Sequence, residues 1–265
     1  MLKKLMLAVA GMVALPAMAA TDVWNFNSGS IQGTGNGNTF NVNGSGTNKL
    51  SMKGYSDTGG TSDNLLETGR LSYSSSYGLM LQNRDENNTV PSHSIDSYGN
   101  DVDMVLLTFD TAVSLTRFGI GWACEFPNSQ QSSCEGNIPS ANAQADITVA
   151  AYTGSGAFTM SSSATWSSLV SNNWSTVGHY GNVSDWSYQS VATTITSKYW
   201  LIGAYNPAFG GASGTVDYTN RDGFKLASVE GMTYTPPTSQ VPVPGTLALV
   251  LGGLVGLSSA RKRRQ

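Results

Sequence analysis

Residues 104–122 read MVLLTFDTAVSLTRFGIGW and contain two of the clearest strand patterns in the chain. Residues 104–109 and 115–122 are rich in β-branched, aromatic and aliphatic side chains, which are enriched in β-strands. No convincing helical pattern follows either run. The stretch therefore predicts two strands and points to an all-β protein.

Eight further runs share this character: residues 22–26, 49–55, 70–73, 78–82, 146–152, 174–180, 199–205 and 223–235. The segments between the runs are rich in Gly, Asn, Ser and Asp, as in residues 33–38, which favour turns. Ten short strands separated by such turns predict an all-β, jelly-roll-like sandwich of two sheets over residues 21–234. One helical turn is expected at residues 165–172, with Trp166, Leu169 and Val170 on one side.

The composition is typical of an exported β-protein. Of 265 residues, 12% are charged and 30 are glycine, whereas soluble proteins carry about 25% charged residues. Six of the 14 basic residues lie at the two ends, which leaves eight basic against 17 acidic residues, a net charge of −9. A body of this charge lacks a basic surface for phosphate contacts, so nucleic acid is excluded as a partner.

The first 20 residues have the layout of a secretory signal peptide. Lys3 and Lys4 precede an apolar run at residues 5–15, and Pro16 is followed by the small-residue site at residues 17–19. These are the three regions that signal peptides require. The sequence therefore predicts export, with residues 1–20 removed.

The last 31 residues divide into a spacer and an apolar segment. Residues 235–245 hold four prolines and predict a stiff linker. Residues 246–265 predict a short hydrophobic helix, which begins uncharged and closes with the basic tail Arg261, Lys262, Arg263 and Arg264. Positive charge is retained on the cytoplasmic side of a membrane. We expect the helix to hold the chain in a membrane, either permanently as a plain anchor or transiently.

This three-part tail resembles the PEP-CTERM sorting signal of Gram-negative bacteria. The matching hinge residues are Val241, Pro242, Val243, Pro244, Gly245 and Thr246. Val243 stands where that family usually has Glu, and related glycine-rich sorting tails share the same layout. The resemblance implies that an exosortase-type membrane enzyme removes the tail near Pro244. It also implies delivery to the cell surface or the extracellular matrix.

The body of the chain is similar to a group of exosortase-dependent surface proteins. The residues that carry the similarity are 83–86, 91–96, Gly99, 103–109, 120–122, 146–149, 200–206 and 223–226. The resemblance implies location and fold. The family has no assigned catalytic activity, so the resemblance says nothing about chemistry.

Two cysteines, Cys124 and Cys134, enclose nine residues. An isolated even pair in an exported protein normally forms a disulfide, and the tighter spacing of redox-active pairs is absent. We therefore expect a bond between them that staples a loop.

Residues 96–103 form an acidic segment. Asp96, Asp101 and Asp103 could give Ca²⁺ some of its six to eight oxygen ligands, although the spacing is not that of an EF-hand. The alternative is a solvated turn in which Asp96 caps and Asp103 begins a strand. Weaker candidate ligands are Asp146 and Asp222.

Signs of an enzyme are few. The chain has only two histidines, His93 and His179, and no nucleophile elbow. Glu67 with Glu125 or Asp146 could form the carboxylate pair of a glycoside hydrolase. A chain with 17 acidic residues offers such pairs by chance, so a glycan-acting hydrolase ranks third among the functional interpretations.

Aromatic residues support a binding role. Trp24, Trp122, Trp174 and Trp200 fall in strand patterns and are expected in the core. Other aromatic residues are expected in loops, where flat rings can stack on sugars: Tyr98, Trp166, Trp186, Tyr188 and Tyr218.

Of these loop residues, Trp186 and Tyr188 are the candidate glycan contacts. The sequence thus predicts a noncatalytic structural or adhesive protein of extracellular polysaccharide or biofilm. A dedicated carbohydrate-binding module is the alternative.

Overall fold

The structure is a computed structural model of the whole chain, all of whose described residues lie in the compact unit Ala19–Tyr234. The described residues are 20–58, 64–85, 93–98, 101–127, 134, 142–211 and 220–233. Apart from Ala20, the predicted signal peptide lies outside these ranges. The predicted linker (235–245) and the hydrophobic tail (246–265) also lie outside them. Within the described ranges, no helix is long and apolar enough to span a membrane.

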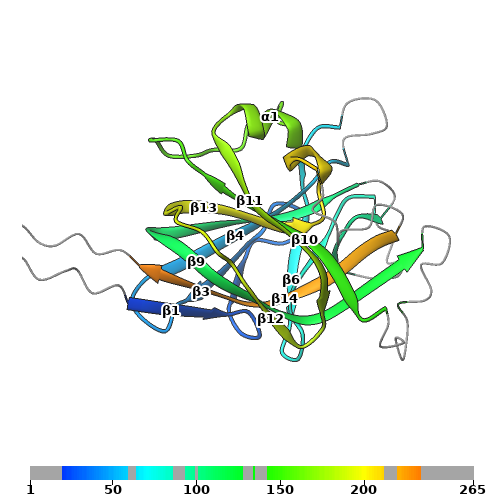
Figure 1. Cartoon of the computed structure of the whole chain (residues 1–265), viewed down its shortest axis with the longest axis horizontal. Helices are drawn as coiled ribbons and strands as arrows, with labels where there is room; N and C mark the ends of the chain where they lie inside the picture. The colour runs from blue at the N-terminus through cyan, green and yellow to red at the C-terminus, as the bar shows by residue number, and fades with distance from the viewer. Residues whose placement is uncertain are drawn as a thin grey trace, which may run out of the picture. The chain divides into compact units, whose positions relative to one another are not determined.

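The 25-residue strand β9 (Asp103–Pro127) replaces the two strands predicted at 104–109 and 115–122. Its first part pairs with β4 (Lys49–Ser56) on one side and β13 (Ser197–Ala204) on the other. Its second part pairs with β14 (Asn220–Thr233) and β12 (Ser187–Ser190). One strand therefore links two sets of partners (Figure 1).

The polar residues between the two predicted strands do not end β9, because a side chain completes the hydrogen bonding there. Asn48 Nδ2 donates to the Thr111 carbonyl and Asn48 Oδ1 accepts from the Thr111 N–H, both at 3.0 Å. The side-chain amide of Asn48 thus makes the two hydrogen bonds with Thr111 that the backbone of a neighbouring strand would otherwise make. Buried Val113 follows, paired with both β13 and β14.

Five more predicted strands are present: β1 (Ala20–Asn25), β6 (Arg70–Ser74), β7 (Gly78–Gln82), β10 (Gln144–Tyr152) and β11 (Trp174–Ser184). The sequence does not predict five short strands: β2 (Ser30–Gln32), β3 (Thr39–Asn43), β5 (Glu67–Thr68), β8 (Ile95–Asp96) and β12. Strands of two or three residues are too short to show a period of two, and β12 is mostly polar.

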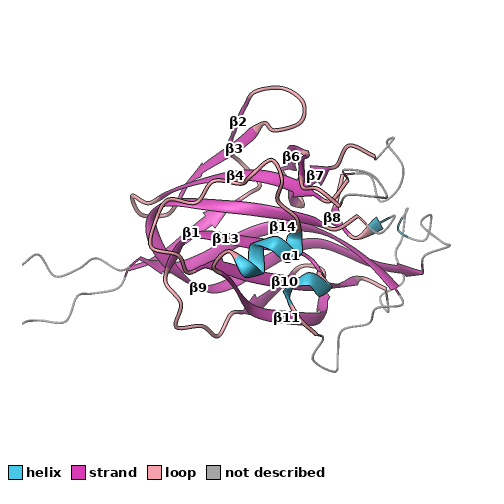
Figure 2. Ribbon diagram, turned by 90° about the horizontal axis from the view of Figure 1, so that it is seen from above, coloured by secondary structure: helices cyan, strands magenta, loops and turns pink. Residues whose placement is uncertain are grey.

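All described strand pairs are antiparallel and belong to one hydrogen-bonded sheet. The main order is β11-β10-β13-β9-β14-β7-β6, with the remaining strands attached beside it. Figure 2 shows strands throughout, with α1 the labelled helix. The all-β prediction is confirmed, and the jelly-roll-like packing of two sheets stays a prediction.

The main core gathers side chains from both halves of β9 and its partners. Val105, Leu107 and Phe109 come from the first half, and Phe118 and Ile120 come from the second. Trp24 and Trp200 are fully buried among them, and Trp174 is buried in a second cluster, as predicted.

The predicted helical turn is present as α1 (Trp166–Ser171), which Thr165 caps at its N-terminus. Trp166 and Leu169 are buried, but Val170 is 42% exposed, so its predicted place on the same side as Trp166 and Leu169 is wrong. Trp166 was also expected in an exposed loop, and that expectation is wrong because the helix turns its ring into the core.

Cys124 and Cys134 form the predicted disulfide, with their Cα atoms 5.9 Å apart. Both cysteines are buried with Phe126 against Tyr98 and Trp122. The disulfide therefore ties Cys134 to β9 within a small apolar cluster that is separate from the main core.

Candidate functional site

Trp186 is the most exposed large hydrophobic side chain among the described residues, at 63%. It lies in the two-residue turn that joins β11 to β12, and its φ of 51° is in the left-handed region. Bulky side chains rarely adopt this conformation, and strained residues of this kind cluster at functional sites. The turn thus holds a large apolar ring in solvent at a conformational cost.

Tyr77 packs beside Trp186, with the two ring centroids 5.5 Å apart. Tyr77 lies in the turn between β6 and β7, and its backbone rests on Gly121 of β9. A Cβ atom at Gly121 would lie 2.2 Å from the Tyr77 carbonyl oxygen. Only glycine at this position lets the β6–β7 turn approach β9 so closely.

Tyr188 is 61% exposed and lies on β12 opposite Gly119 of β9. A Cβ atom at Gly119 would lie 2.9 Å from Tyr188 Cε1. The absence of a side chain at Gly119 therefore leaves room for the ring of Tyr188 against β9. The guanidinium of Arg117 lies 4.5 Å from the Tyr188 ring centroid and also pairs with Glu230. This ion pair fixes the cation over the ring.

Trp122 was predicted in the core, and that prediction is wrong, because the ring is only half-buried. The strand register shifts here: Lys225 of β14 pairs with Trp122, whereas the next residue, Leu226, pairs with Ile120. The shift places Trp122 beside Lys225. The Lys225 ammonium lies 5.0 Å from the Trp122 ring centroid and 5.1 Å from that of Tyr77.

These side chains form one assembly, which we call the aromatic–basic surface: Tyr77, Arg117, Trp122, Trp186, Tyr188 and Lys225. It is assembled on β9 from the β6–β7 turn, the β11–β12 turn, β12 and β14. Burial lowers the pKa of Lys225. Flat rings beside cationic donors are suited to binding a ligand that has both apolar faces and polar edges.

Two of the other three aromatic residues expected in loops, Tyr98 and Trp166, do not join this surface. Tyr98 packs on Phe126, with ring centroids 6.4 Å apart, and Trp166 is buried. Tyr218 lies outside the described residues.

The acidic segment brings two carboxylates into the interior, because Asp96 on β8 and Asp103 at the start of β9 are both fully buried. Asp96 accepts from Ser94 Oγ at 2.8 Å and from the Tyr98 N–H at 3.0 Å. Asp103 Oδ1 accepts from Asn83 Nδ2 at 3.3 Å. The pair is therefore a buried structural element and not a solvated turn.

One oxygen of this pair is unsatisfied. Asp103 Oδ2 and Ser56 Oγ are both buried without a hydrogen-bond partner among the described residues. Burial, followed by the charge of Asp96, raises the pKa of Asp103 well above its ordinary value. A proton on Asp103 would remove one of the two negative charges of this pair.

Asp101 lies at the edge of the same acidic group. Burial, with the charges of Asp57, Asp85 and Asp96, raises the pKa of Asp101 to about 6. Within the described part of the chain, no three or more His, Cys, Asp or Glu side chains are grouped so that they could hold a metal ion. Backbone and hydroxyl oxygens can also bind Ca²⁺, so the calcium site at Asp96, Asp101 and Asp103 stays a prediction.

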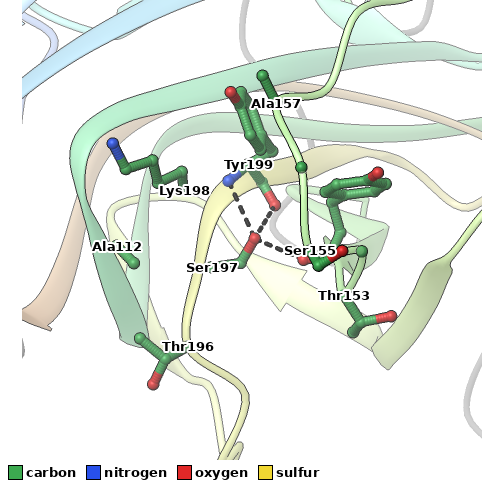
Figure 3. A pocket seen from close by; sticks show the side chains of 11 residues that line it. Ala112, Thr153, Ser155, Ala157, Thr196, Ser197, Lys198 and Tyr199 are labelled. Atoms are coloured by element: carbon green, nitrogen blue, oxygen red, sulfur yellow. Dashed lines mark hydrogen bonds between the residues drawn. The ribbon is translucent and has the colours of Figure 1, made fainter.

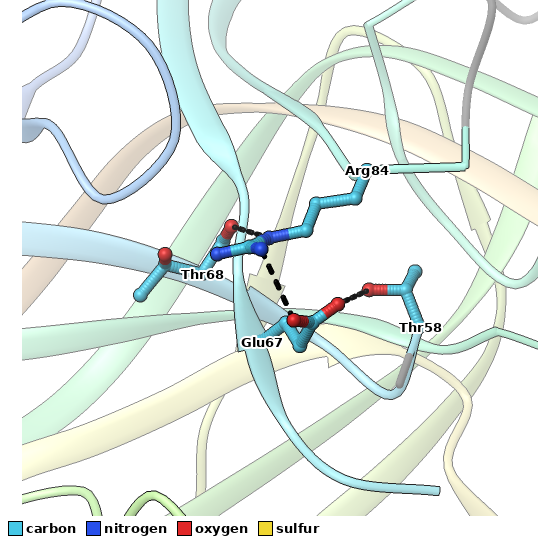
Figure 4. A network of polar contacts seen from close by, with 4 residues as sticks. All are labelled: Thr58, Glu67, Thr68 and Arg84. Atoms are coloured by element: carbon cyan, nitrogen blue, oxygen red, sulfur yellow. Dashed lines mark hydrogen bonds and ion pairs between the residues drawn. The ribbon is translucent and has the colours of Figure 1, made fainter. Parts of the chain in front are cut away.

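The carboxylates considered for hydrolysis each have structural partners. Glu67 pairs with Arg84 at 3.1 Å and accepts from Thr58 Oγ1 at 3.4 Å, while Arg84 also donates to the Thr68 carbonyl (Figure 4).

The two possible partners of Glu67 are also engaged elsewhere. Glu125 accepts from Gln144 and Asn220, each at 2.6 Å. Asp146 is buried and accepts from the Asn182 N–H at 2.7 Å. These contacts join neighbouring strands and loops.

The two histidines lie in different surroundings. His179 Nδ1 lies 2.9 Å from Thr148 Oγ1, and burial lowers the pKa of His179. His93 has a φ of 60°, and its pKa is lowered by burial and then by the charges of Arg70 and Lys225. The positive charges of Arg70 and Lys225 therefore act on His93.

A separate hollow of about 400 Å³ lies between residues 153–157 and 196–199 (Figure 3). At this hollow, Ser197 Oγ donates to the Tyr152 carbonyl at 2.6 Å and accepts from the Tyr199 N–H at 3.0 Å. The hydroxyl joins β10 to β13, so it serves the fold.

Three comparisons, with protein-family models, with curated proteins and with solved structures, find no match to this chain. The resemblance of the tail to sorting signals and of the body to surface proteins therefore stays a prediction. The functional conclusion depends on the geometry described above.

Sequence reasoning identified Trp186 and Tyr188 as candidates but missed Tyr77, Lys225 and Arg117. One signal was available, because Gly119 and Gly121 alternate along β9 and mark a strand face that other groups approach closely. The register shift that turns Trp122 outward has no such signal, because it depends on the pairing of β9 with a strand about 100 residues later.

The first prediction concerns the buried acidic pair. The pKa of Asp103 is higher in the folded state than in the unfolded state. The contribution of Asp103 to the free energy of unfolding is therefore fully present below the unfolded pKa, at pH ~4, and is lost as the pH rises through the pKa of the folded state. Asp103→Asn removes this loss, with a slope of up to about 1.4 kcal/mol per pH unit. We expect the variant to gain melting temperature relative to the wild type between pH 5 and pH 8, measured by calorimetry with chelator present. Exposed Asp110→Asn is the control, and a difference that does not change with pH would contradict the assignment.

Calcium is tested separately. If Asp96, Asp101 and Asp103 share Ca²⁺, millimolar calcium added to chelator-treated protein at pH 7.5 raises the melting temperature by several degrees. A hundredfold excess over Kd is worth about 2.7 kcal/mol, and 1 kcal/mol is worth roughly 2–4 °C in a domain of this size. Magnesium should not reproduce the rise, and Asp103→Asn should abolish it. A melting temperature that calcium does not raise specifically would refute the calcium site at these three residues.

Proposed function

We propose that the protein is a noncatalytic, exported adhesive or structural component of extracellular polysaccharide or biofilm, and that it binds glycan at the aromatic–basic surface. The observation that carries the proposal is the exposure of Trp186 in a strained turn, beside the ring of Tyr77. Trp186 and Tyr77 are exposed rings in contact with one another, and contiguous exposed apolar groups, unlike isolated ones, mark interaction sites.

The chemistry of the surface suits a sugar ring better than a purely apolar partner. The faces of pyranose rings are lined by C–H groups that stack on aromatic rings, and their edges carry hydroxyl groups that accept hydrogen bonds. Trp186 and Tyr188 supply the rings, while Arg117 and Lys225 supply donors at the edges. Binding at such a surface needs no catalytic group.

Export and sorting belong to the same proposal and are supported by the sequence of the two ends. In this proposal the chain crosses the inner membrane and is held there transiently by its C-terminal helix. An exosortase-type enzyme then processes it, and the domain, a jelly-roll-like sandwich of two sheets, reaches the cell surface or matrix. A dedicated carbohydrate-binding module would use the same rings, and a hydrolase would need a carboxylate pair near them.

The third prediction is that Trp186→Ala weakens polysaccharide binding by about 10- to 30-fold, the loss that follows removal of a dominant interface ring. Trp186→Phe keeps a stacking face and should retain most of the affinity. Binding is measured by affinity electrophoresis in gels that contain a panel of bacterial polysaccharides.

The matched control is Tyr73→Ala, because Tyr73 is also exposed but stacks on Phe40 and not on Trp186. All variants should melt within about 2 °C of the wild type, since exposed positions contribute little to stability. Equal retardation of Trp186→Ala and wild type across the panel would refute binding through this ring.

The fourth prediction concerns the tail. Mass spectrometry of protein released from the cell surface should show a C terminus near Pro244. A variant in which Gln replaces the four residues of the basic tail, Arg261, Lys262, Arg263 and Arg264, should be retained and processed less well, while its domain stays folded. Mature surface protein that still ends in Gln265 would instead favour the plain membrane anchor.

A further inference from the structure

Among the residues that the structure describes, the ammonium group of Lys225 has no counter-ion. It lies between the rings of Trp122 and Tyr77, at 5.0 and 5.1 Å from their centroids. Within the described residues, the two ion pairs join Arg84 to Glu67 and Arg117 to Glu230, and the side chain of Lys225 has no ion pair or hydrogen bond.

The neighbouring charges add to this positive site. Arg70 and Lys225 both act on His93, and their charges lower its pKa after the larger effect of burial. The rest of the body is acidic, with eight basic against 17 acidic residues outside the two ends. A local group of basic side chains on an acidic protein attracts an anionic ligand that the remaining surface would repel.

The rings and the cation are close enough to act on one ligand. Tyr77 contacts both, because its ring centroid lies 5.5 Å from that of Trp186 and 5.1 Å from Lys225 Nζ. A sugar ring stacked on Trp186 therefore has Lys225 within reach of itself or of the next residue in its chain. The ligand should combine an apolar ring face with a nearby anionic group.

We infer that the aromatic–basic surface binds polysaccharides whose sugars bear carboxylates, with Trp186 stacking on a sugar ring and Lys225 binding the carboxylate. This inference rests on the proposed function and names its ligand class. Lysine offers a single compact cation, which suits one carboxylate oxygen and lacks the bidentate fork of arginine. Two rings shield this cation from water, which strengthens its attraction to an anion.

The test compares acidic polysaccharides with their carboxyl-reduced forms, in which each carboxylate becomes a neutral hydroxymethyl group. Polygalacturonate, polymannuronate, hyaluronan and xanthan are each paired with the reduced form and titrated into the full chain by calorimetry at low salt. Because wild-type protein alone shows whether the carboxylate matters, the inference stays testable even if a variant fails to fold. We expect at least one acidic form to bind about 10-fold more tightly than its reduced form, the worth of one charge-assisted hydrogen bond.

Variants locate the effect at Lys225. Lys225→Gln should bind the acidic and the reduced forms about equally tightly, and Lys225→Arg should keep part of the preference for the acidic form. Lys53→Gln, at an exposed lysine on β4, is the matched control and should change nothing.

Each other outcome contradicts a different step. Equal binding of the acidic and reduced forms, with both lost in Trp186→Ala, would overturn the inference and leave the proposed function intact. No binding of any polysaccharide would overturn both. Polyglutamate that binds as tightly as the acidic polysaccharides would overturn the inference, because the surface would then recognise an acidic polypeptide by charge alone.

Discussion

The structure depends on the unbroken hydrogen bonding of β9, which runs from Asp103 to Pro127 and pairs with β4, β12, β13 and β14. The two hydrogen bonds between Asn48 and Thr111 carry the strand past its polar interruption. Because side chains alternate along a strand, Phe118 and Ile120 on one face of the second half of β9 pack into the main core. The other face carries Gly119 and Gly121, on which the exposed rings are seated.

Sequence patterns predicted ten strands, which correspond to nine strands of the structure, because each run has enough alternating or apolar residues to show a period. They predicted two strands where β9 is one. The strand continues at Thr111 because Asn48 hydrogen-bonds to it, and Asn48 lies 63 positions away in the sequence. Trp122 was placed in the core for a similar reason. Its outward position follows from a register shift against β14, and no local pattern encodes the pairing of distant strands.

The candidate surface was predictable only in part. Trp186 and Tyr188 are recognisable because a turn sequence and a polar strand surround them. Tyr77 and Lys225 join them only through contacts between four separate elements, so neither is distinguished in the sequence. The acidic segment shows the reverse: its sequence suggests an exposed loop, whereas the fold buries Asp96 and Asp103 completely. Burial and charge crowding then set their chemistry.

Rigid support is what makes the exposed rings suitable for recognition, because ordering a mobile side chain on binding would cost free energy. Trp186 leans on Tyr77, and Tyr77 rests on the backbone of β9. The most direct test of the account is a crystal structure of the protein with an acidic oligosaccharide that binds in solution. We expect a sugar ring stacked on Trp186 and a carboxylate oxygen within salt-bridge distance of Lys225 Nζ. A sugar bound elsewhere, with Trp186 still exposed to solvent, would contradict it.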